Sequence, residues 1–190
     1  MEFQVTFDYL CPFARNANEA VLNGLADGRE WEVTFRPFSL AQVHTDEGEP
    51  DVFDDPTASG VRALHWGLAV RELDPERFPA THTALFAARH DDGLDLADEE
   101  VVRGAVASGG ADPNAVAEVV ASGEPARILA EEHTEAVDRW GVFGVPTFLA
   151  DDVGTFVRFM SRGDVDDLDR TLAILDWQEL NEFKRTRVPR

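Results

Sequence analysis

The beginning of the chain alternates between apolar and polar residues. Over residues 2–8, Phe3, Val5 and Phe7 share one face, and polar side chains share the other. A period of two is typical of a strand with one buried face, so we expect a strand here. The same alternation predicts a second strand over residues 31–35.

Between these strands the apolar spacing becomes helical. From Phe13 onward, apolar residues recur at the spacing of one helix face as far as Leu25. Pro12 suits the first helical position, where the N–H that proline lacks would have no partner. We therefore expect a strand, a short turn over residues 9–12 and then a helix.

The middle of the chain has a helical pattern. Residues 44–57 are acidic and rich in turn-forming residues, which predicts an exposed loop. The helices predicted beyond it cover residues 59–73, 79–89 and 98–106 and begin again at Asp112 and Glu124, each of which precedes a proline. We interpret residues 55–135 as a helical insertion into a domain made of residues 1–54 and 136–190.

Strands return near the end of the chain. Residues 146–150 and 155–160 are predicted strands, and residues 151–154 are the expected hairpin turn between them. Asp164 or Asp166 is expected to cap a last helix, whose candidate core positions are Leu168, Leu172, Leu175 and Leu180. The order predicts an α/β fold, and we expect the first strand to lie parallel beside the third.

Composition and charge narrow the classes of partner. The 190 residues include 37 acidic and 17 basic ones, for a formal net charge of −20. A surface this negative repels phosphate backbones and anionic lipid headgroups, so we expect neither a nucleic-acid nor a membrane partner. No apolar stretch of about 18 residues is present, so no transmembrane helix is expected.

The chain contains one cysteine, Cys11, which excludes a disulfide within the chain. The first residues lack both a basic start and a long apolar core, so we expect no signal peptide and a cytoplasmic, reducing setting. An exposed Cys11 would also permit a disulfide-linked homodimer on oxidation.

The position of Cys11 is more informative than its number. It lies between a predicted strand and a predicted helix, with Pro12 directly after it. Free N–H groups and the positive end of the helix dipole would face its sulfur and favour the thiolate. Most single cysteines are small buried apolar residues, but this position favours a nucleophile.

A second motif, Gly144-Val145-Pro146-Thr147, leads into the third predicted strand. Taken alone, Pro146 is an ordinary proline at the start of a strand. If its peptide bond is cis, however, the strand begins in a tight bend. The backbone of Val145 would then be free to pair with an extended substrate.

Together, the two motifs resemble the DsbA-like thioredoxin-fold family. The similarity extends to FrnE-type proteins, 2-hydroxychromene-2-carboxylate isomerases, kappa-class glutathione transferases and the mycothiol-dependent reductases of actinobacteria. The resemblance implies a thioredoxin-like fold with an inserted α-helical subdomain, a catalytic Cys11 and a cis bond at Pro146. It also implies that Pro12, Val145, Pro146 and Thr147 lie at the substrate site, and we expect them to bind the substrate together with Phe13.

One departure from this family limits the chemistry. Its redox members have a second cysteine in a Cys-Pro-x-Cys motif, where this chain has Ala14. A mixed disulfide at Cys11 must therefore be resolved by another molecule, such as glutathione or mycothiol. We expect a thiol-dependent oxidoreductase with a single reactive cysteine and a thiol or disulfide substrate. The alternatives are a glutathione- or mycothiol-dependent isomerase or transferase, and a non-catalytic binding module.

Other polar residues carry weaker signals. Asp8 is a candidate for tuning Cys11 or capping a loop, and Arg15, one turn beyond Cys11, either supports a thiolate or is merely solvated. Tyr9 and Phe13 line a substrate groove or belong to the core. The five histidines lack metal-ligand spacing, so no metal site is expected. We also expect no bound cofactor, with glutathione or mycothiol as the candidate co-substrate.

Overall fold

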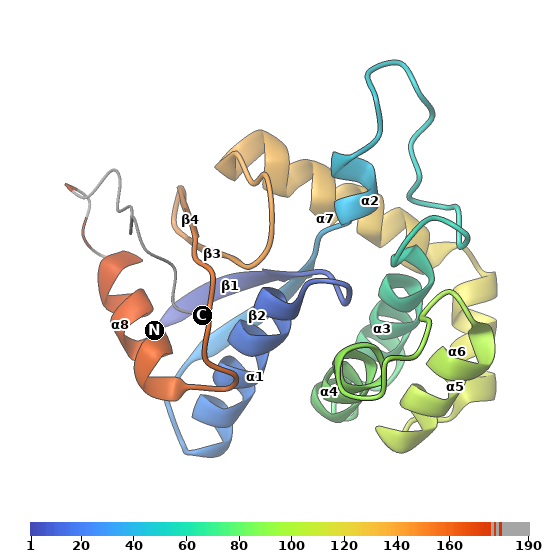
Figure 1. The fold of residues 1–190 in the computed structure, drawn as a ribbon, viewed down its shortest axis with the longest axis horizontal. Coiled ribbons are helices and arrows are strands. Elements are labelled where there is room, and N and C mark those ends of the chain that lie inside the picture. Colours follow the sequence, from blue (N-terminus) through green and yellow to red (C-terminus); the bar gives the residue numbers. More distant parts are fainter. Residues whose placement is uncertain (176, 178, 180–190) are drawn as a thin grey trace.

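A computed structural model describes residues 1–175, 177 and 179, so the predicted core position Leu180 lies outside the described residues. A four-stranded sheet in the order β2-β1-β3-β4 forms its centre (Figure 1). The expected α/β class, a thioredoxin-like mixed sheet with helices inserted between its second and third strands, is confirmed.

The first three elements form a β-α-β unit. Strand β1 (Glu2–Phe7) leads through helix α1 (Pro12–Ala26) to strand β2 (Glu32–Pro37), and β1 and β2 pair in parallel. The alternating side chains of Phe3, Val5 and Phe7 are all buried, as the period-two pattern predicts. A helical crossover is the usual way to join parallel strands, because the chain must return to the same end of the sheet.

Strand β3 (Thr147–Ala150) lies beside β1, as expected, but the predicted parallel direction is wrong. The two strands pair antiparallel, with Val5 opposite Phe148. The reason lies in the position of the two motifs. Cys11 follows the end of β1 and Val145 precedes the start of β3, so they meet at one edge of the sheet only if the strands run in opposite directions.

The terminal hairpin is shorter than predicted. Strand β4 (Val153–Phe156) pairs antiparallel with β3 through a two-residue turn in which Asp151 has a φ of 52°. The predicted strand over residues 155–160 is therefore wrong beyond Phe156. The side-chain amide of Asn16 donates to the carbonyl oxygen of Phe159 over 2.9 Å, which ties this segment to α1 instead of to the sheet.

The helices between β2 and β3 lie mostly to one side of the sheet (Figure 1). They are α2 (Leu40–Val43), α3 (Val61–Leu73), α4 (Phe78–His90), α5 (Glu99–Ser108), α6 (Pro113–Ala121) and α7 (Glu124–Trp140). Asp98 and Asp112 cap α5 and α6, because each carboxylate accepts a backbone N–H of the first turn. Helix α7 contacts both α3 and β2, so it joins this helical group to the sheet.

The last described helix, α8 (Val165–Leu175), packs against α1. Asp164, not Asp166, caps it, since the Asp164 carboxylate accepts the N–H of Asp167 over 3.0 Å. Among the described residues, no helix is both long and apolar enough to cross a membrane.

Candidate active site

Cys11 is the N-cap residue of α1. Its sulfur accepts the backbone N–H of Ala14 over 3.4 Å, as a capping side chain does. The thiol also donates to the carbonyl oxygen of Val145, and the sulfur and oxygen are 3.4 Å apart. The chain thus brings its two motifs together at the sulfur.

The segment that carries Val145 is held by the start of β3. The peptide bond between Val145 and Pro146 is cis. The N–H of Thr147 donates to the hydroxyl of Thr6 over 2.8 Å, and the Thr147 hydroxyl donates to the carbonyl oxygen of Gly144 over 2.7 Å. Both contacts are buried, so Thr147 orients the loop from the inside.

The remaining expected site residues differ in exposure. Pro12 is exposed and Phe13 is half-buried, so both lie at the surface beside Cys11. Val145, Pro146 and Thr147 are buried. Tyr9, left open as a groove or core residue, belongs to the core with no exposed surface.

The electrostatic environment of Cys11 differs from the sequence-based expectation. Burial raises the pKa of the thiol above its ordinary value, and only 9% of the residue is exposed. The backbone N–H groups of Ala14 and Phe13 lower this pKa, as expected of a helix N-terminus, and so does the charge of Arg158. Desolvation is the largest of these effects, so the expectation of a favoured thiolate is wrong.

Asp8 supports the turn before Cys11. Its two carboxylate oxygens accept the backbone N–H groups of Leu10, over 2.9 Å, and Leu40, over 2.8 Å. Burial nevertheless raises the pKa of this carboxyl group to about 6. Asp8 therefore both caps the loop and acts on Cys11, since its negative charge raises the pKa of the thiol.

A buried polar chain lies behind the turn. The hydroxyl of Tyr9 is 2.9 Å from Nδ1 of His82, and His82 Nε2 is 3.1 Å from Oδ1 of Asn18. The Asn18 amide nitrogen donates to the carbonyl oxygen of Ala14 over 2.8 Å, so its oxygen must accept from Nε2. His82 is thus neutral with its proton on Nε2, and burial lowers its pKa to about 3.

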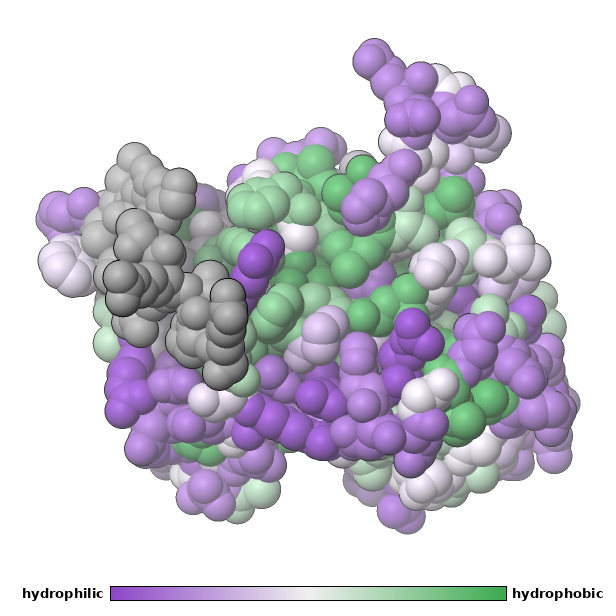
Figure 2. Space-filling view, viewed as in Figure 1, coloured by the Kyte–Doolittle hydropathy of each residue, from purple (hydrophilic) through white to green (hydrophobic). Residues whose placement is uncertain are grey.

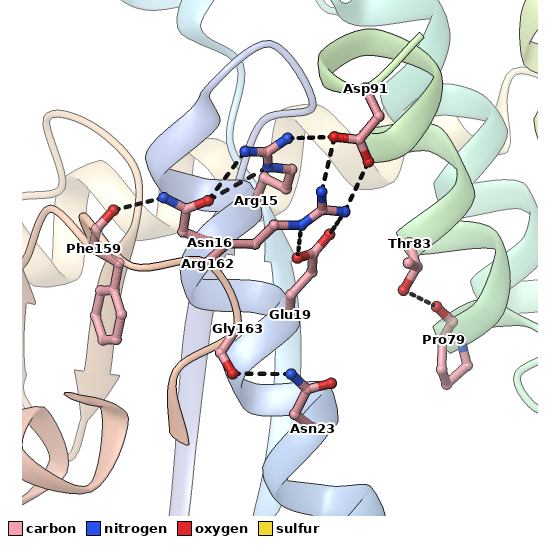
Figure 3. A network of polar contacts seen from close by, with 10 residues as sticks. All are labelled: Arg15, Asn16, Glu19, Asn23, Pro79, Thr83, Asp91, Phe159, Arg162 and Gly163. Atoms are coloured by element: carbon pink, nitrogen blue, oxygen red, sulfur yellow. Dashed lines mark hydrogen bonds and ion pairs between the residues drawn. The ribbon is translucent and has the colours of Figure 1, made fainter. Parts of the chain in front are cut away.

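Arg15, for which the sequence allowed either support of the thiolate or simple solvation, is engaged elsewhere. Its guanidinium forms an ion pair with Asp91 over 2.9 Å (Figure 3). Arg162 reaches the same carboxylate over 2.8 Å and also pairs with Glu19 of α1. This network joins α1, the end of α4 and the segment after β4.

The cation that acts on Cys11 is Arg158, which the sequence analysis missed. Its guanidinium carbon lies 5.6 Å from the centre of the Phe13 ring and 5.9 Å from that of Phe156. The sequence contained no signal for Arg158, because residues 155–160 were predicted to form a strand. In an alternating strand pattern, one polar residue does not stand out from the others. Only the tertiary structure places this arginine, which follows β4, over Phe13 of α1.

Apolar side chains gather on this face of the molecule. Figure 2 shows an apolar area across the middle of the view, and in Figure 1 the turn between β1 and α1 lies there. Phe143, two residues before Val145, is 68% exposed and packs on Phe156 with a distance of 5.1 Å between ring centres. A separate hollow of about 320 Å³ beside β2, lined by Phe35, Arg71 and Glu132 among others, does not include Cys11.

Histidines other than the exposed His44 form hydrogen bonds within the fold. His90 donates from Nε2 to the carbonyl oxygen of Tyr9, His65 donates to that of Phe53, and His133 accepts the N–H of Ser39. No three His, Cys, Asp or Glu side chains within the described part of the chain are arranged to hold a metal ion. At the site itself, the nucleophilic group is the Cys11 sulfur, beside the backbone N–H groups of Phe13 and Ala14.

Comparison with known proteins agrees with this architecture. A model of the DSBA-like thioredoxin domain matches residues 3–173. No curated protein matches the chain in sequence.

Solved structures show the same fold at low sequence identity. The cytosolic disulfide reductase DsbM from Pseudomonas aeruginosa, with GSH, is 20% identical, with a TM-score of 0.65 over 92% of this chain and 98% of that one. A 2-hydroxychromene-2-carboxylate isomerase is 19% identical, with a TM-score of 0.64 over 94% and 97%. The thiol-disulfide exchange protein alpha-DsbA2 from Wolbachia pipientis is 17% identical, with a TM-score of 0.61 over 92% and 81%.

Proposed function

Because the chain belongs to the DsbA-like thioredoxin domain family, we propose that it is a thiol-dependent oxidoreductase that acts through Cys11 alone. The observation that carries this proposal is the position of the Cys11 sulfur. It caps α1, where two backbone N–H groups favour its anion, and it lies against the carbonyl oxygen of Val145. A substrate sulfur that reaches Cys11 would find the backbone of Val145 beside it.

The reaction that one cysteine supports is exchange with a mixed disulfide, X–S–S–R. The Cys11 thiolate attacks the sulfur of R, which forms Cys11–S–S–R and releases X–S⁻. A free thiol R–SH then loses its proton and attacks the R sulfur of that adduct. This second step forms R–S–S–R and restores the Cys11 thiolate, so in one cycle X–S–S–R and one R–SH become X–SH and R–S–S–R.

The raised pKa of Cys11 shapes this mechanism. In the resting protein Cys11 is a thiol, and this thiol donates a hydrogen bond to the carbonyl oxygen of Val145. A thiolate of higher pKa is intrinsically more nucleophilic but less abundant. Proton loss therefore precedes attack, and the positive charge of Arg158 and the N–H groups of α1 support the anion once it forms.

The small thiol that resolves the Cys11 adduct is also proposed. Glutathione and mycothiol both fit the requirement for a small thiol that resolves the adduct. A reducing compartment such as the cytoplasm would supply either one, and the similar fold of the cytosolic DsbM, solved with GSH, supports that setting. Neither thiol needs to stay bound between turnovers.

The test is the intact mass of the protein after incubation with glutathione disulfide. We expect one adduct on the wild type, its removal by reduced glutathione, and none on Cys11→Ser. Serine is a suitable control because its hydroxyl also caps a helix and so retains the N–H of Ala14. A wild-type protein that forms no adduct with this or any other small disulfide would refute the proposal.

The hydrogen bond from Cys11 to Val145 favours a second candidate. A neutral thiol that donates a hydrogen bond is suited to orienting the thiolate of a bound glutathione or mycothiol, as a thiol-dependent isomerase or transferase would require. This candidate predicts that reduced thiols raise the melting temperature without any covalent adduct. Adduct formation that is reversed by the same thiol favours exchange instead.

A further inference from the structure

Arg158 has an unusual environment for an arginine of this protein. Most other arginines of the described residues pair with carboxylates, for example Arg71 with Glu132 and Arg127 with Glu124 and Glu131. Within the same residues, Arg158 has no ion pair and no hydrogen bond, and it is exposed. Its guanidinium instead lies over the rings of Phe13 and Phe156.

The backbone on either side of Arg158 is anchored to the site. The N–H of Val157 donates to the carbonyl oxygen of Pro146 over 3.2 Å. On the other side, Asn16 of α1 holds the carbonyl oxygen of Phe159. Further along, Arg162 pairs with Glu19 and Asp91, and Asn23 donates to the carbonyl oxygen of Gly163 (Figure 3). These contacts therefore fix the position of the Arg158 backbone. Its side chain extends over the ring of Phe13, and Phe13 is two residues after Cys11 in the chain.

A guanidinium on aromatic faces keeps its hydrogen-bonding edge available. The cation–π contact uses the flat face of the group, whereas its five N–H donors point outward in the plane. Carboxylates are the ligands that such a fork binds best, by two parallel hydrogen bonds. The aromatic contacts also restrict the side chain, so less conformational entropy is lost when an anion binds.

The negative net charge of the protein increases the effect that Arg158 can have on an anionic reactant. With a net charge of −20, the surface as a whole repels an anionic reactant. A local positive charge beside Cys11 would reverse that repulsion at the one place where the reactant must approach. The same charge acts on the sulfur, so a single side chain serves both the nucleophile and its partner.

We propose that Arg158 is a specificity-determining residue that binds a carboxylate of the small thiol or disulfide reacting at Cys11. This inference rests on the proposed function and names its substrate class. The site favours carboxylate-bearing reactants such as glutathione over uncharged ones such as mycothiol. Arg158 does not form or break a bond; it holds the anionic end of the reactant while the sulfurs exchange.

The experiment compares three small disulfides that differ in charge: 3,3′-dithiodipropionate, bis(2-hydroxyethyl) disulfide and cystamine. Each reacts by the same step, in which the Cys11 thiolate attacks one sulfur, forms the mixed disulfide and releases one thiolate. The readout is the ratio of the adduct rates for the anionic and the neutral disulfide. Because both reactions use the same thiolate, a change in the pKa of Cys11 cancels in this ratio, whereas a lost carboxylate contact does not.

We expect Arg158→Gln to lower this ratio about five- to tenfold relative to the wild type, as the loss of one charge-assisted contact implies. Arg158→Glu should lower it further and raise the relative rate of cystamine. Arg127→Gln removes the same charge from the exposed start of α7 and should leave the ratio unchanged. The wild-type preference should also weaken with added salt.

Equal ratios in the wild type and both Arg158 variants would overturn the inference while leaving the proposed function intact. If no disulfide reacts at all, the proposed function fails, and binding of the unreactive S-methylglutathione decides the inference by itself. In that case we expect the free acid to bind more tightly than its dimethyl ester, and Arg158→Gln to abolish the difference. Equal binding of acid and ester by the wild type would refute the role of Arg158.

Discussion

The sulfur of Cys11 lies 3.4 Å from the carbonyl oxygen of Val145, although 134 positions separate the two residues in the chain. A carbonyl oxygen is an acceptor, so it stabilises the thiol and not the thiolate. This contact and the burial of the sulfur act together, and both oppose the N–H groups at the start of α1. The balance between them determines how the cysteine reacts.

The first prediction concerns the alkylation of Cys11 by iodoacetamide as a function of pH. Since burial raises the pKa of the thiol, we expect the rate to rise with pH and to reach half its maximum above the ordinary cysteine value. Arg158→Gln should move that midpoint higher still, because it removes a positive charge that favours the thiolate. A rate that is already at its plateau near neutral pH would contradict the raised pKa.

The second prediction concerns Asp8 and the pH dependence of stability. The pKa of its carboxyl group is raised from 3.8 to about 6, so the folded state binds this proton more tightly than the unfolded state does. The resulting stability is fully present below pH 3.8 and is lost as the pH rises through 6. Relative to Asp8→Asn, the wild type should lose about 2–3 kcal/mol of unfolding free energy between pH 4 and pH 7.

Urea unfolding of both proteins across this pH range measures the difference. The Asn side chain cannot accept both N–H groups that Asp8 accepts, so the variant should be less stable at pH 4. Parallel pH profiles for the two proteins would show that Asp8 titrates normally.

The third prediction has the opposite sign and concerns His82. Burial lowers its pKa from 6.5 to about 3, so the unfolded state binds the proton more tightly. The stability that this neutral imidazole contributes is present above pH 6.5 and is lost as the pH falls toward 3. Relative to His82→Gln, the wild type should lose about 3 kcal/mol between pH 7 and pH 4. A constant difference between the two unfolding curves over that range would contradict the burial of a neutral His82.

The fourth prediction uses a pair of helical glycines. A Cβ at Gly67 of α3 would overlap the hydroxyl of Tyr9, which is buried and bonded to His82. We expect Gly67→Ala to cost about 1–3 kcal/mol, because the tyrosine must move out of its hydrogen bond. Gly104 of α5 is exposed, and nothing lies within 4 Å of a Cβ placed there. Gly104→Ala should therefore stabilise the protein by about 0.5–1 kcal/mol, the usual gain in helix propensity.

Thermal unfolding of the two variants side by side tests the packing around Tyr9. The comparison controls for the change in propensity, which is the same at both positions. If both substitutions stabilise the protein, the Tyr9 hydroxyl does not pack closely against Gly67 of α3.

Much of the fold could be predicted from short-range patterns. The alternation of Phe3, Val5 and Phe7 predicted β1, and Pro12 marked the start of α1. The caps Asp98 and Asp112 marked two further helices. These signals succeed because strand alternation, helix spacing and capping each depend on residues only a few positions apart. The strand through residue 160 failed because Asn16, from a distant part of the chain, takes the carbonyl oxygen that a strand would have used.

By itself, the sequence determined that one cysteine stands at a junction of strand and helix, that Ala14 leaves it without a resolving partner, and that the two motifs resemble the DsbA-like family. Only the tertiary structure decided that the carbonyl oxygen of Val145 contacts the Cys11 sulfur and that the pKa of the Cys11 thiol is raised. It also decided that the cation acting on this thiol is Arg158, whereas Arg15 pairs with Asp91. The physical reason is that desolvation and long-range charge depend on which distant side chains exclude water from a group, and local spacing carries no record of them.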